Sequence, residues 1–197
     1  GSMTAAPAFS SSVNVRYTSS SQNTTTGPEL PTSPTVLADL QVMSDIAIVT
    51  LNSSVTVNGN LTLSNGIFDN NGSADDLTLT LANNSTIRRA TGTLTTPPIF
   101  GTSMNLEYIS TLGDVTTGFE IPASATILNN LTLTTTMIIT LGSDAVVNGT
   151  LTFTNNKIVT DEYSLTAKGS VVGAGAGKFV DGKLLYPVSS PVIAQWE

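Results

Sequence analysis

The sequence predicts an all-β fold, namely a right-handed parallel β-helix (a solenoid) of roughly eight short coils. Three observations lead to this prediction. The chain repeats itself after about 91 residues, each copy is built from short runs that alternate apolar residues with Thr, and turns rich in Asn and Gly separate these runs. No segment carries the apolar periodicity of 3.6 residues and the capping residues that are typical of a helix.

The repeat divides the chain into four parts. Copy 1 is expected to span residues 13–103, and copy 2 to continue directly from it over residues 104–190. Residues 1–12 are expected to combine the remnant of a purification tag with a disordered lead-in, and residues 191–197 to form a tail. No signal peptide is visible in this sequence.

Strand-like runs recur inside each copy, with a corner roughly every 7–12 residues. In copy 1 the runs are Val36–Val42, Ile46–Leu51, Val55–Val57, Leu61–Leu63 and Leu77–Leu81. The corners are Asn58-Gly59, Asn65-Gly66, Asn71-Gly72, Asn83-Asn84 and Asn148-Gly149. Three strands and three corners take roughly 20–25 residues, so each copy holds four coils. The usual hand of parallel crossovers predicts a right-handed coil.

Tandem antiparallel β-sandwiches are the alternative fold, because each copy has about the length of one sandwich and Asn-Gly corners also suit hairpins. We favour the solenoid because the strands are very short and evenly spaced. Two proline-containing segments, Ser19–Pro34 and Thr95–Gly101, interrupt this rhythm. Because proline lacks a ladder donor, we expect both segments to be long corners that form a loop-rich ridge on one face.

Composition excludes several classes of function. The chain has 7 Lys and Arg against 14 Asp and Glu, a net charge of −7, which argues against a nucleic-acid partner. It has no Cys and no His, so no thiolate nucleophile, imidazole base or disulfide is possible. No apolar run reaches the length of a membrane span. We therefore expect no membrane insertion. The stiff rod that a solenoid forms is expected to be a monomer unless an uncapped end pairs with another chain.

The two copies share a motif that resembles a known family. Asn14–Tyr17 returns as Asn105–Tyr108, and Thr26–Pro31 returns as Thr117–Pro122. Together with the later Val-x-Val-Asn-Gly-x-Leu-Thr-Leu string, these motifs resemble the long repeats of very large, type IX-exported, adhesin-like surface proteins of Bacteroidota. The resemblance implies an extracellular, cell-surface location and a structural or adhesive task within a larger parent chain, and it supplies no catalytic residues. We expect no cofactor other than the candidate Ca²⁺ ion described below.

Residues that recur in both copies are expected to serve the fold of the repeat. Glu29 and Glu120 recur 91 residues apart, so four coils at about 4.8 Å each would separate them by roughly 19 Å. That distance is too long for a glycosidase pair, and we expect each glutamate to accept backbone N–H bonds in its corner. The proposed structural motif residues are Gly27, Glu29, Pro31, Asn58, Gly59, Gly118, Glu120, Pro122, Asn148 and Gly149.

Three further groups of residues are candidates for function. Asp69, Asp75 and Asp76 form an oxygen-rich corner that is a candidate Ca²⁺ site, although a solvated corner is favoured. The doublet Arg88-Arg89 is a candidate for contact with an acidic sugar, but the favoured interpretation is a charged edge that discourages stray strand pairing. The rings that are candidates for stacking on a sugar are Tyr17, Tyr108, Phe100 and Phe119, although half-buried packing is favoured for the two tyrosines because they lie in alternating strands.

These observations favour a non-catalytic spacer or display module. A polysaccharide-binding module, with polysaccharide or another cell surface as its partner, is the alternative. A polysaccharide-degrading enzyme on a β-helix is a remote third possibility, because a lyase needs clustered basic and acidic side chains. A cluster of Arg88, Arg89 and Lys157 beside aspartates would favour that third hypothesis.

Overall fold

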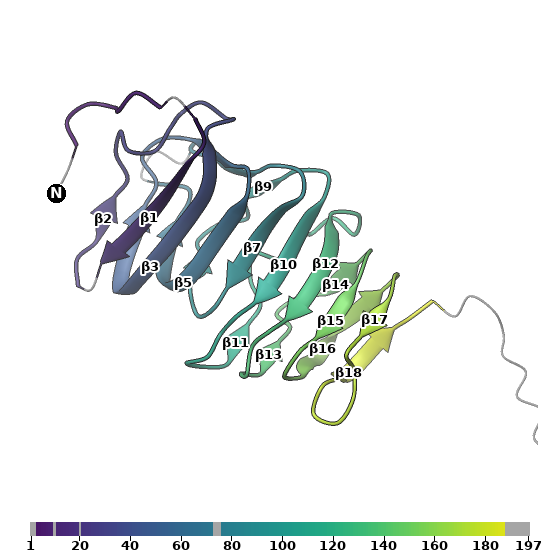
Figure 1. Cartoon of the computed structure of the whole chain (residues 1–197). Helices are drawn as coiled ribbons and strands as arrows, with labels where there is room; N and C mark the ends of the chain where they lie inside the picture. Colours follow the sequence, from purple (N-terminus) through teal and green to yellow (C-terminus); the bar gives the residue numbers. More distant parts are fainter. Residues whose placement is uncertain (1–2, 10, 20, 73–75, 188–197) are drawn as a thin grey trace, which may run out of the picture.

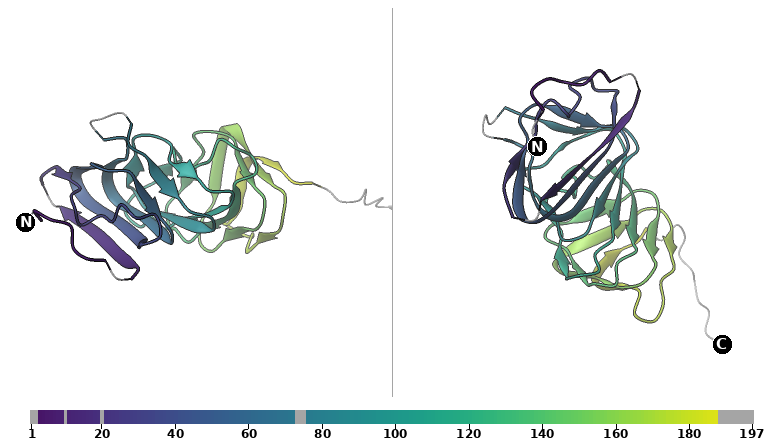
Figure 2. Two further views of the ribbon diagram at one scale, coloured as in Figure 1. Left: turned by 90° about the horizontal axis from the view of Figure 1, so that it is seen from above. Right: turned by 60° about the vertical axis from the view of Figure 1, so that its left-hand side comes forward.

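The structure, a computed structural model, describes residues 3–9, 11–19, 21–72 and 76–187. These residues form strands and turns and no helix, so none of them belongs to a helix that could cross a membrane. The strands wind into an elongated stack of coils with the N-terminus at one end and the last strand at the other (Figures 1 and 2). The predicted parallel β-solenoid of about eight coils is therefore confirmed.

Short strands dominate, and three long strands bend around a corner of the coil. The strands are β1 (Val13–Ser19), β2 (Thr24–Thr25), β3 (Leu37–Thr50), β4 (Val55–Val57), β5 (Asn60–Asp69), β6 (Leu79–Leu81), β7 (Ser85–Arg89), β8 (Thr93–Leu94), β9 (Ile99–Phe100), β10 (Met104–Tyr108), β11 (Val115–Thr116), β12 (Leu128–Leu133), β13 (Ile139–Thr140), β14 (Ala145–Val147), β15 (Leu151–Phe153), β16 (Ile158–Ala167), β17 (Val171–Val172) and β18 (Val180–Leu185).

The first face of the solenoid carries one strand from each coil. Its order is β1-β3-β5-β7-β10-β12-β15-β17, and every neighbouring pair is parallel. Strands β1 and β10, which start the two copies, lie four ladder steps apart, so one repeat makes four coils. Since the strand pairs of the described residues are parallel, the antiparallel sandwich alternative is wrong.

The second and third faces are shorter and less regular. Strands β2 and β8 pair with the second halves of β3 and β5, and further on β11, β13 and β16 continue the second face. The third face holds β4-β6-β9 and then β14, β16 and β18. In the first and fifth coils a proline-containing corner follows the second face instead of a third-face strand. Of the two segments predicted to be long corners, Ser19–Pro34 holds β2 and then most of the first-coil corner. The prediction is wrong for Thr95–Gly101, which contains the third-face strand β9.

One apolar core runs through both copies. Inward side chains stack in register from coil to coil. Val42 lies opposite Leu63 of the next coil, and in copy 2 Leu133 lies opposite Phe153. Thirty-three buried apolar residues form a single cluster from Tyr17 to Ala167. Because each buried Leu, Ile or Val contributes roughly 1.5–3 kcal/mol, this shared core makes the coils depend on their neighbours.

The recurring Asn-Gly corners hold a bulge on the preceding coil. Between β1 and β3 the register skips Ala38, and between β10 and β12 it skips Asn129 in the same way. The Gly59 N–H donates to the Ala38 carbonyl at 2.7 Å, and the Gly149 N–H donates to the Asn129 carbonyl at the same distance. A Cβ on Gly59 would meet a backbone oxygen at 3.0 Å, so glycine is needed for this close approach.

Candidate functional site

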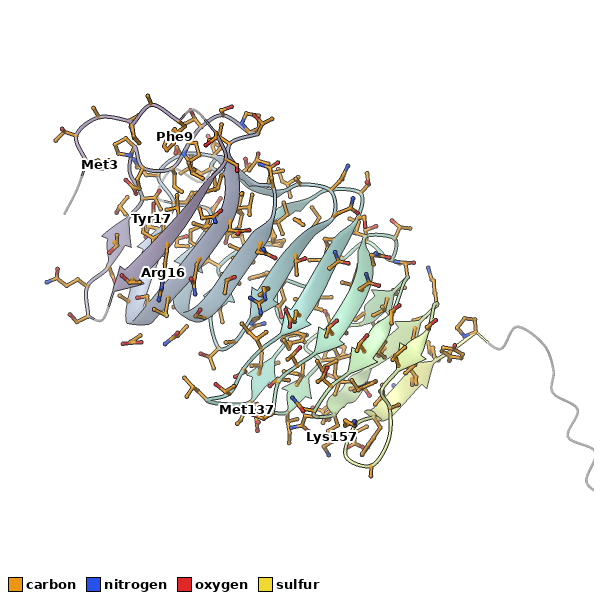
Figure 3. The ribbon with its side chains drawn as sticks, in the orientation of Figure 1. Met3, Phe9, Arg16, Tyr17, Met137 and Lys157 are labelled. Atoms are coloured by element: carbon orange, nitrogen blue, oxygen red, sulfur yellow. The ribbon has the colours of Figure 1, made fainter. Side chains whose placement is uncertain are left out.

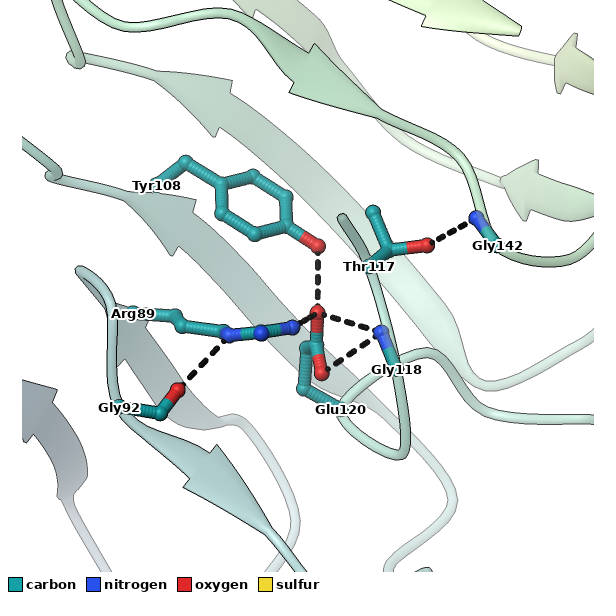
Figure 4. Close-up of polar contacts among 7 residues, drawn as sticks. All are labelled: Arg89, Gly92, Tyr108, Thr117, Gly118, Glu120 and Gly142. Carbon is teal, nitrogen blue, oxygen red and sulfur yellow. Dashed lines mark hydrogen bonds and ion pairs between the residues drawn. The ribbon is translucent and has the colours of Figure 1, made fainter. Parts of the chain in front are cut away.

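A buried polar cluster lies where copy 1 meets copy 2 (Figure 4). The Glu120 carboxylate accepts hydrogen bonds from the Tyr108 hydroxyl at 2.7 Å and from the Gly118 N–H at 3.0 Å. It also forms an ion pair with the Arg89 guanidinium, whose Nε donates to the Gly92 carbonyl at 2.9 Å. The side chains of Arg89 and Glu120 are only 6% and 2% exposed, so this ion pair is fully enclosed.

Three neighbouring stretches of chain build this cluster. Arg89 ends β7 and Tyr108 ends β10, and the two residues are direct partners in the parallel ladder. Glu120 reaches back from the corner that follows β11. In the same corner the Thr117 hydroxyl accepts the N–H of Gly142 from the next coil at 2.9 Å (Figure 4). The cluster therefore ties the fourth, fifth and sixth coils together.

The first copy holds a counterpart of this cluster. The Glu29 carboxylate accepts hydrogen bonds from the Tyr17 hydroxyl at 2.5 Å and from the Gly27 N–H at 2.6 Å. The Thr26 hydroxyl accepts the Asn52 N–H at 2.9 Å. The expected backbone hydrogen bond to the corner glutamate is thus present in both copies.

The two tyrosines stay protonated as donors to their glutamates. Burial, followed by the hydrogen bond to Glu29, raises the pKa of the Tyr17 phenol far above its ordinary value. Burial, followed by the charge of Glu120, raises the pKa of Tyr108 in the same direction. For Glu29, burial by itself raises the pKa, but the hydrogen bonds from Tyr17 and Gly27 outweigh it and lower the pKa below 4.5.

The interpretation of Arg88-Arg89 as a charged edge is wrong. Both residues lie in β7, a central strand of the first face. Arg88 points outward and pairs with Glu107 of the next coil at 2.8 Å, whereas Arg89 points into the core. The alternation of inward and outward positions along the strand indicates that Arg89 points inward, because it occupies the position that Leu63 occupies one coil earlier. Its partner Glu120 lies 31 residues away and left no local pattern.

The tyrosines are also not a sugar platform. Tyr17 is 8% exposed and Tyr108 is fully buried, so neither ring offers a face to a ligand. Their amphipathic rings instead fill the core and deliver a hydroxyl to the glutamate. Phe100 is half-buried in β9 and packs against the core, while Phe119 is 44% exposed on the copy 2 corner. Of the four candidate rings, Phe119 is the one left accessible.

The other structural motif residues lie around these clusters. Pro31 and Pro122 are buried directly behind the two corners. The Asn58 amide donates to the Pro34 carbonyl at 2.8 Å, and the Asn148 amide donates to the Ala125 carbonyl at 3.0 Å. The copies therefore use the same side chains for the same contacts between coils.

The candidate Ca²⁺ corner is only partly visible. Asp69 accepts a hydrogen bond from the Thr95 hydroxyl at 3.0 Å, and Asp76 is exposed. Asp75 lies outside the described residues. Among the residues that the structure describes, no three acidic, His or Cys side chains come together as metal ligands.

The outer side of the first face carries a polar hollow of about 300 Å³. Arg16, Gln41, Thr62 and Arg88 follow one another in register across its first four coils. The hollow is lined by Asn14, Val15, Arg16, Asp39, Gln41, Asn60, Thr62 and Arg88. Amide, hydroxyl and guanidinium groups of this kind suit hydrogen bonding to a polar ligand.

The basic residues named for a lyase do not cluster. Arg88 pairs with Glu107 on the outer side of the first face, Arg89 lies in the core, and Lys157 pairs with Asp181 near the far end of the solenoid. Comparisons with protein-family models, curated proteins and solved structures yield no match to this chain. The function is therefore argued from the geometry of the repeat.

Proposed function

We propose that this chain is a non-catalytic spacer or display module of a large, extracellular, adhesin-like cell-surface protein. The observation that supports a spacer most directly is the buried pair between Arg89 and Glu120. Arg89 lies in the last coil of copy 1 and Glu120 in the first coil of copy 2, so the pair joins the repeats without a flexible linker. A chain that stacks repeats in this way holds its two ends at a fixed separation.

The use of the recurring residues supports the same proposal. The tyrosine, glutamate, glycine and asparagine kept in both copies contact the chain's own coils, and the two tyrosines are buried. The cell-surface location and the adhesin-like parent protein rest on the resemblance of the repeat motif. The proposal also holds the module to be a monomer within its larger parent chain.

A distance measurement tests the spacer role. Thr18 and Thr154 are exposed and lie beside equivalent ladder positions of the first and seventh coils, six ladder steps apart. Since the chain has no Cys, the double variant Thr18→Cys/Thr154→Cys accepts two spin labels at defined sites. A rigid stack predicts a narrow distance distribution near about 30 Å, from six steps of about 4.8 Å.

The same labels on the Arg89→Met background provide the matched comparison. The distribution should broaden in this variant if the buried pair stiffens the junction between copies. A broad distribution in the chain that retains Arg89 would contradict the spacer function.

Polysaccharide binding is the second candidate, and the polar hollow on the first face favours it. Its arginine, amide and hydroxyl groups suit an acidic or hydroxyl-rich glycan. Native gels cast with soluble polysaccharides, with and without Ca²⁺, test this candidate. Retardation that Arg16→Ala abolishes and Phe119→Ala preserves would place the glycan on the first face. The reverse pattern would place it on the copy 2 corner, and mobility unchanged across the panel would contradict glycan binding.

A further inference from the structure

The two glutamate clusters are not equally complete. Glu120 receives a tyrosine hydroxyl, a backbone N–H and a guanidinium, and it is 1% exposed. Glu29 receives the hydroxyl and the N–H but forms no ion pair with any residue that the structure describes. The nearby Arg16 turns outward and contacts the Met43 sulfur at 3.4 Å. Glu29 is thus a half-buried carboxylate without a cation.

The place where its cation belongs is defined by the ladder. Arg89 lies one step before Tyr108, on strand β7, which pairs with β10. The equivalent step before Tyr17 falls beyond β1, which is the edge strand of the first face. This edge leaves one row of backbone donors and acceptors open to another parallel strand. A strand added there would bring its own side chain to the position that Arg89 occupies in the second cluster.

The lead-in before β1 continues the repeat pattern. Pro7 and Phe9 match Pro98 and Phe100 at the offset of 91 residues, and Ser12 matches Ser103. Residues 98–100 follow β7 in the coil that carries Arg89, and they lead through β9 into copy 2. The lead-in therefore corresponds to the last part of an arginine-bearing coil.

The lead-in also lies in the place that this correspondence requires. Phe9 and Tyr17 lie at the same end of the stack (Figure 3). Ala6 and Phe9 line a hollow of about 570 Å³ together with Leu30 and Pro31 of the copy 1 corner. The hollow therefore lies between the lead-in and the copy 1 corner that carries Glu29.

We propose that this end of the solenoid is a docking surface for an arginine-bearing β-coil of the same kind as residues 79–103. The docked strand pairs in parallel with β1, and its arginine binds the Glu29 carboxylate as Arg89 binds Glu120. The far end of this chain does not offer such a coil. In β17, the last strand of the first face, Val172 pairs with Thr152. The next residue, Gly173, therefore stands at the ladder position that Arg89 holds in the fourth coil. The occupant is therefore an arginine-bearing coil and not a second copy stacked head to tail.

The proposal names the partner of one end of the module, and it is independent of where in the cell the module works. An extended chain tests it, in which a second copy of residues 79–97 replaces residues 1–6 and runs directly into Pro7. The matched control carries Met in place of the added arginine. Both chains are also made with Glu29→Gln, which gives four proteins whose thermal unfolding is followed by circular dichroism.

The expected result is a melting temperature at least about 5 °C higher with the added arginine than with the added Met, when Glu29 is present. The difference should disappear in the Glu29→Gln pair. No difference between arginine and Met, or a difference that survives Glu29→Gln, would overturn the proposal. If the spin-label distances are broad while the added arginine still raises the melting temperature through Glu29, the spacer function is contradicted and the docking proposal stands.

A second measurement on the unextended chain guards against misfolding of the added coil. Guanidinium chloride, kept below denaturing concentrations, should shift the Gly27 amide resonance in a saturable way, with sodium chloride as the ionic-strength control. The Gly118 amide serves as an internal control because its glutamate already holds Arg89. An unshifted Gly27 resonance, an equal shift in Glu29→Gln, or head-to-tail self-association in sedimentation experiments would contradict the proposal.

Discussion

At the scale of single residues, the enclosed Arg89–Glu120 pair carries a large desolvation penalty. Removing two charges from water is unfavourable, and the pair persists because every partner is in place. Tyr108 and Gly118 satisfy the carboxylate, and Gly92 accepts a hydrogen bond from the guanidinium. Losing one member therefore leaves a charge in the core with nothing to balance it.

Replacing Arg89 with Met should lower the free energy of unfolding by about 3–5 kcal/mol, because Glu120 is left buried without its cation. The matched control is Arg88→Met, which removes a partly exposed partner of Glu107 and should cost less than about 1 kcal/mol. Urea denaturation followed by circular dichroism measures both. Equal losses for the two variants would show that the buried pair contributes no more than a surface pair.

Glu29 should make stability depend on pH in the acid range. Its folded-state pKa lies below the ordinary 4.5, so its ionised form stabilises the fold above that pH and the contribution fades as pH falls through the folded pKa. The chain should therefore exceed Glu29→Gln in stability by a constant amount at neutral pH, and the two should converge in acid. Tyr17→Phe removes one of the two hydrogen-bond donors to Glu29. In the Tyr17→Phe background, the difference in stability between the chains with and without Glu29→Gln should therefore be smaller. A gap between the chain and Glu29→Gln that stays constant down to pH 3 would argue against a lowered pKa.

At the scale of elements, the long strands bend because single residues allow the chain to turn a corner. Strand β5 pairs with β3 on the first face up to Asn65 and on the second face from Ile67. Gly66 lies between these segments with φ of +76°, and a Cβ there would lie 2.4 Å from the Ser44 carbonyl oxygen. The bend therefore depends on the missing side chain.

The variant Gly66→Ala should lose at least about 1 kcal/mol of stability, because the left-handed backbone and the close oxygen both oppose a methyl group. Gly175→Ala is the matched control, since a Cβ there would have no neighbour within 4 Å. This control should change stability by less than about 0.5 kcal/mol. A similar cost at both positions would contradict the account of the bend.

At the scale of the whole molecule, the sequence predicted the coil count because the repeat is long and its corners are regular. The match of Asn14–Tyr17 to Asn105–Tyr108 implied four coils per copy, and the ladder from β1 to β10 has four steps. The Asn65-Gly66 and Asn71-Gly72 corners were also predicted, and both glycines have positive φ. Local turn chemistry fixes such features, so a single sequence reveals them.

Contacts between coils were harder to predict than the coils themselves. The glutamates were correctly assigned to the corner, where nearby residues bind them. The sequence alone does not predict the role of Arg89, because its partner Glu120 comes from the next coil and charged residues usually lie on the surface. For the same reason, the sequence does not show that the hydroxyls of Tyr17 and Tyr108 bind Glu29 and Glu120, which only the fold reveals.

Stability should be distributed along the stack in the order that neighbour contacts dictate. Central coils are covered on both sides, so the amides of Leu106 and Leu131 should exchange with deuterium most slowly. Val172 lies on the edge strand β17 and is 50% exposed, so its amide should exchange much faster. In Arg89→Met, exchange should accelerate on both sides of the junction, at Ile87 and at Leu106, because the lost pair connects the copies. Uniform exchange along the chain, or an effect confined to copy 1, would show that the repeats do not unfold as a neighbour-coupled stack.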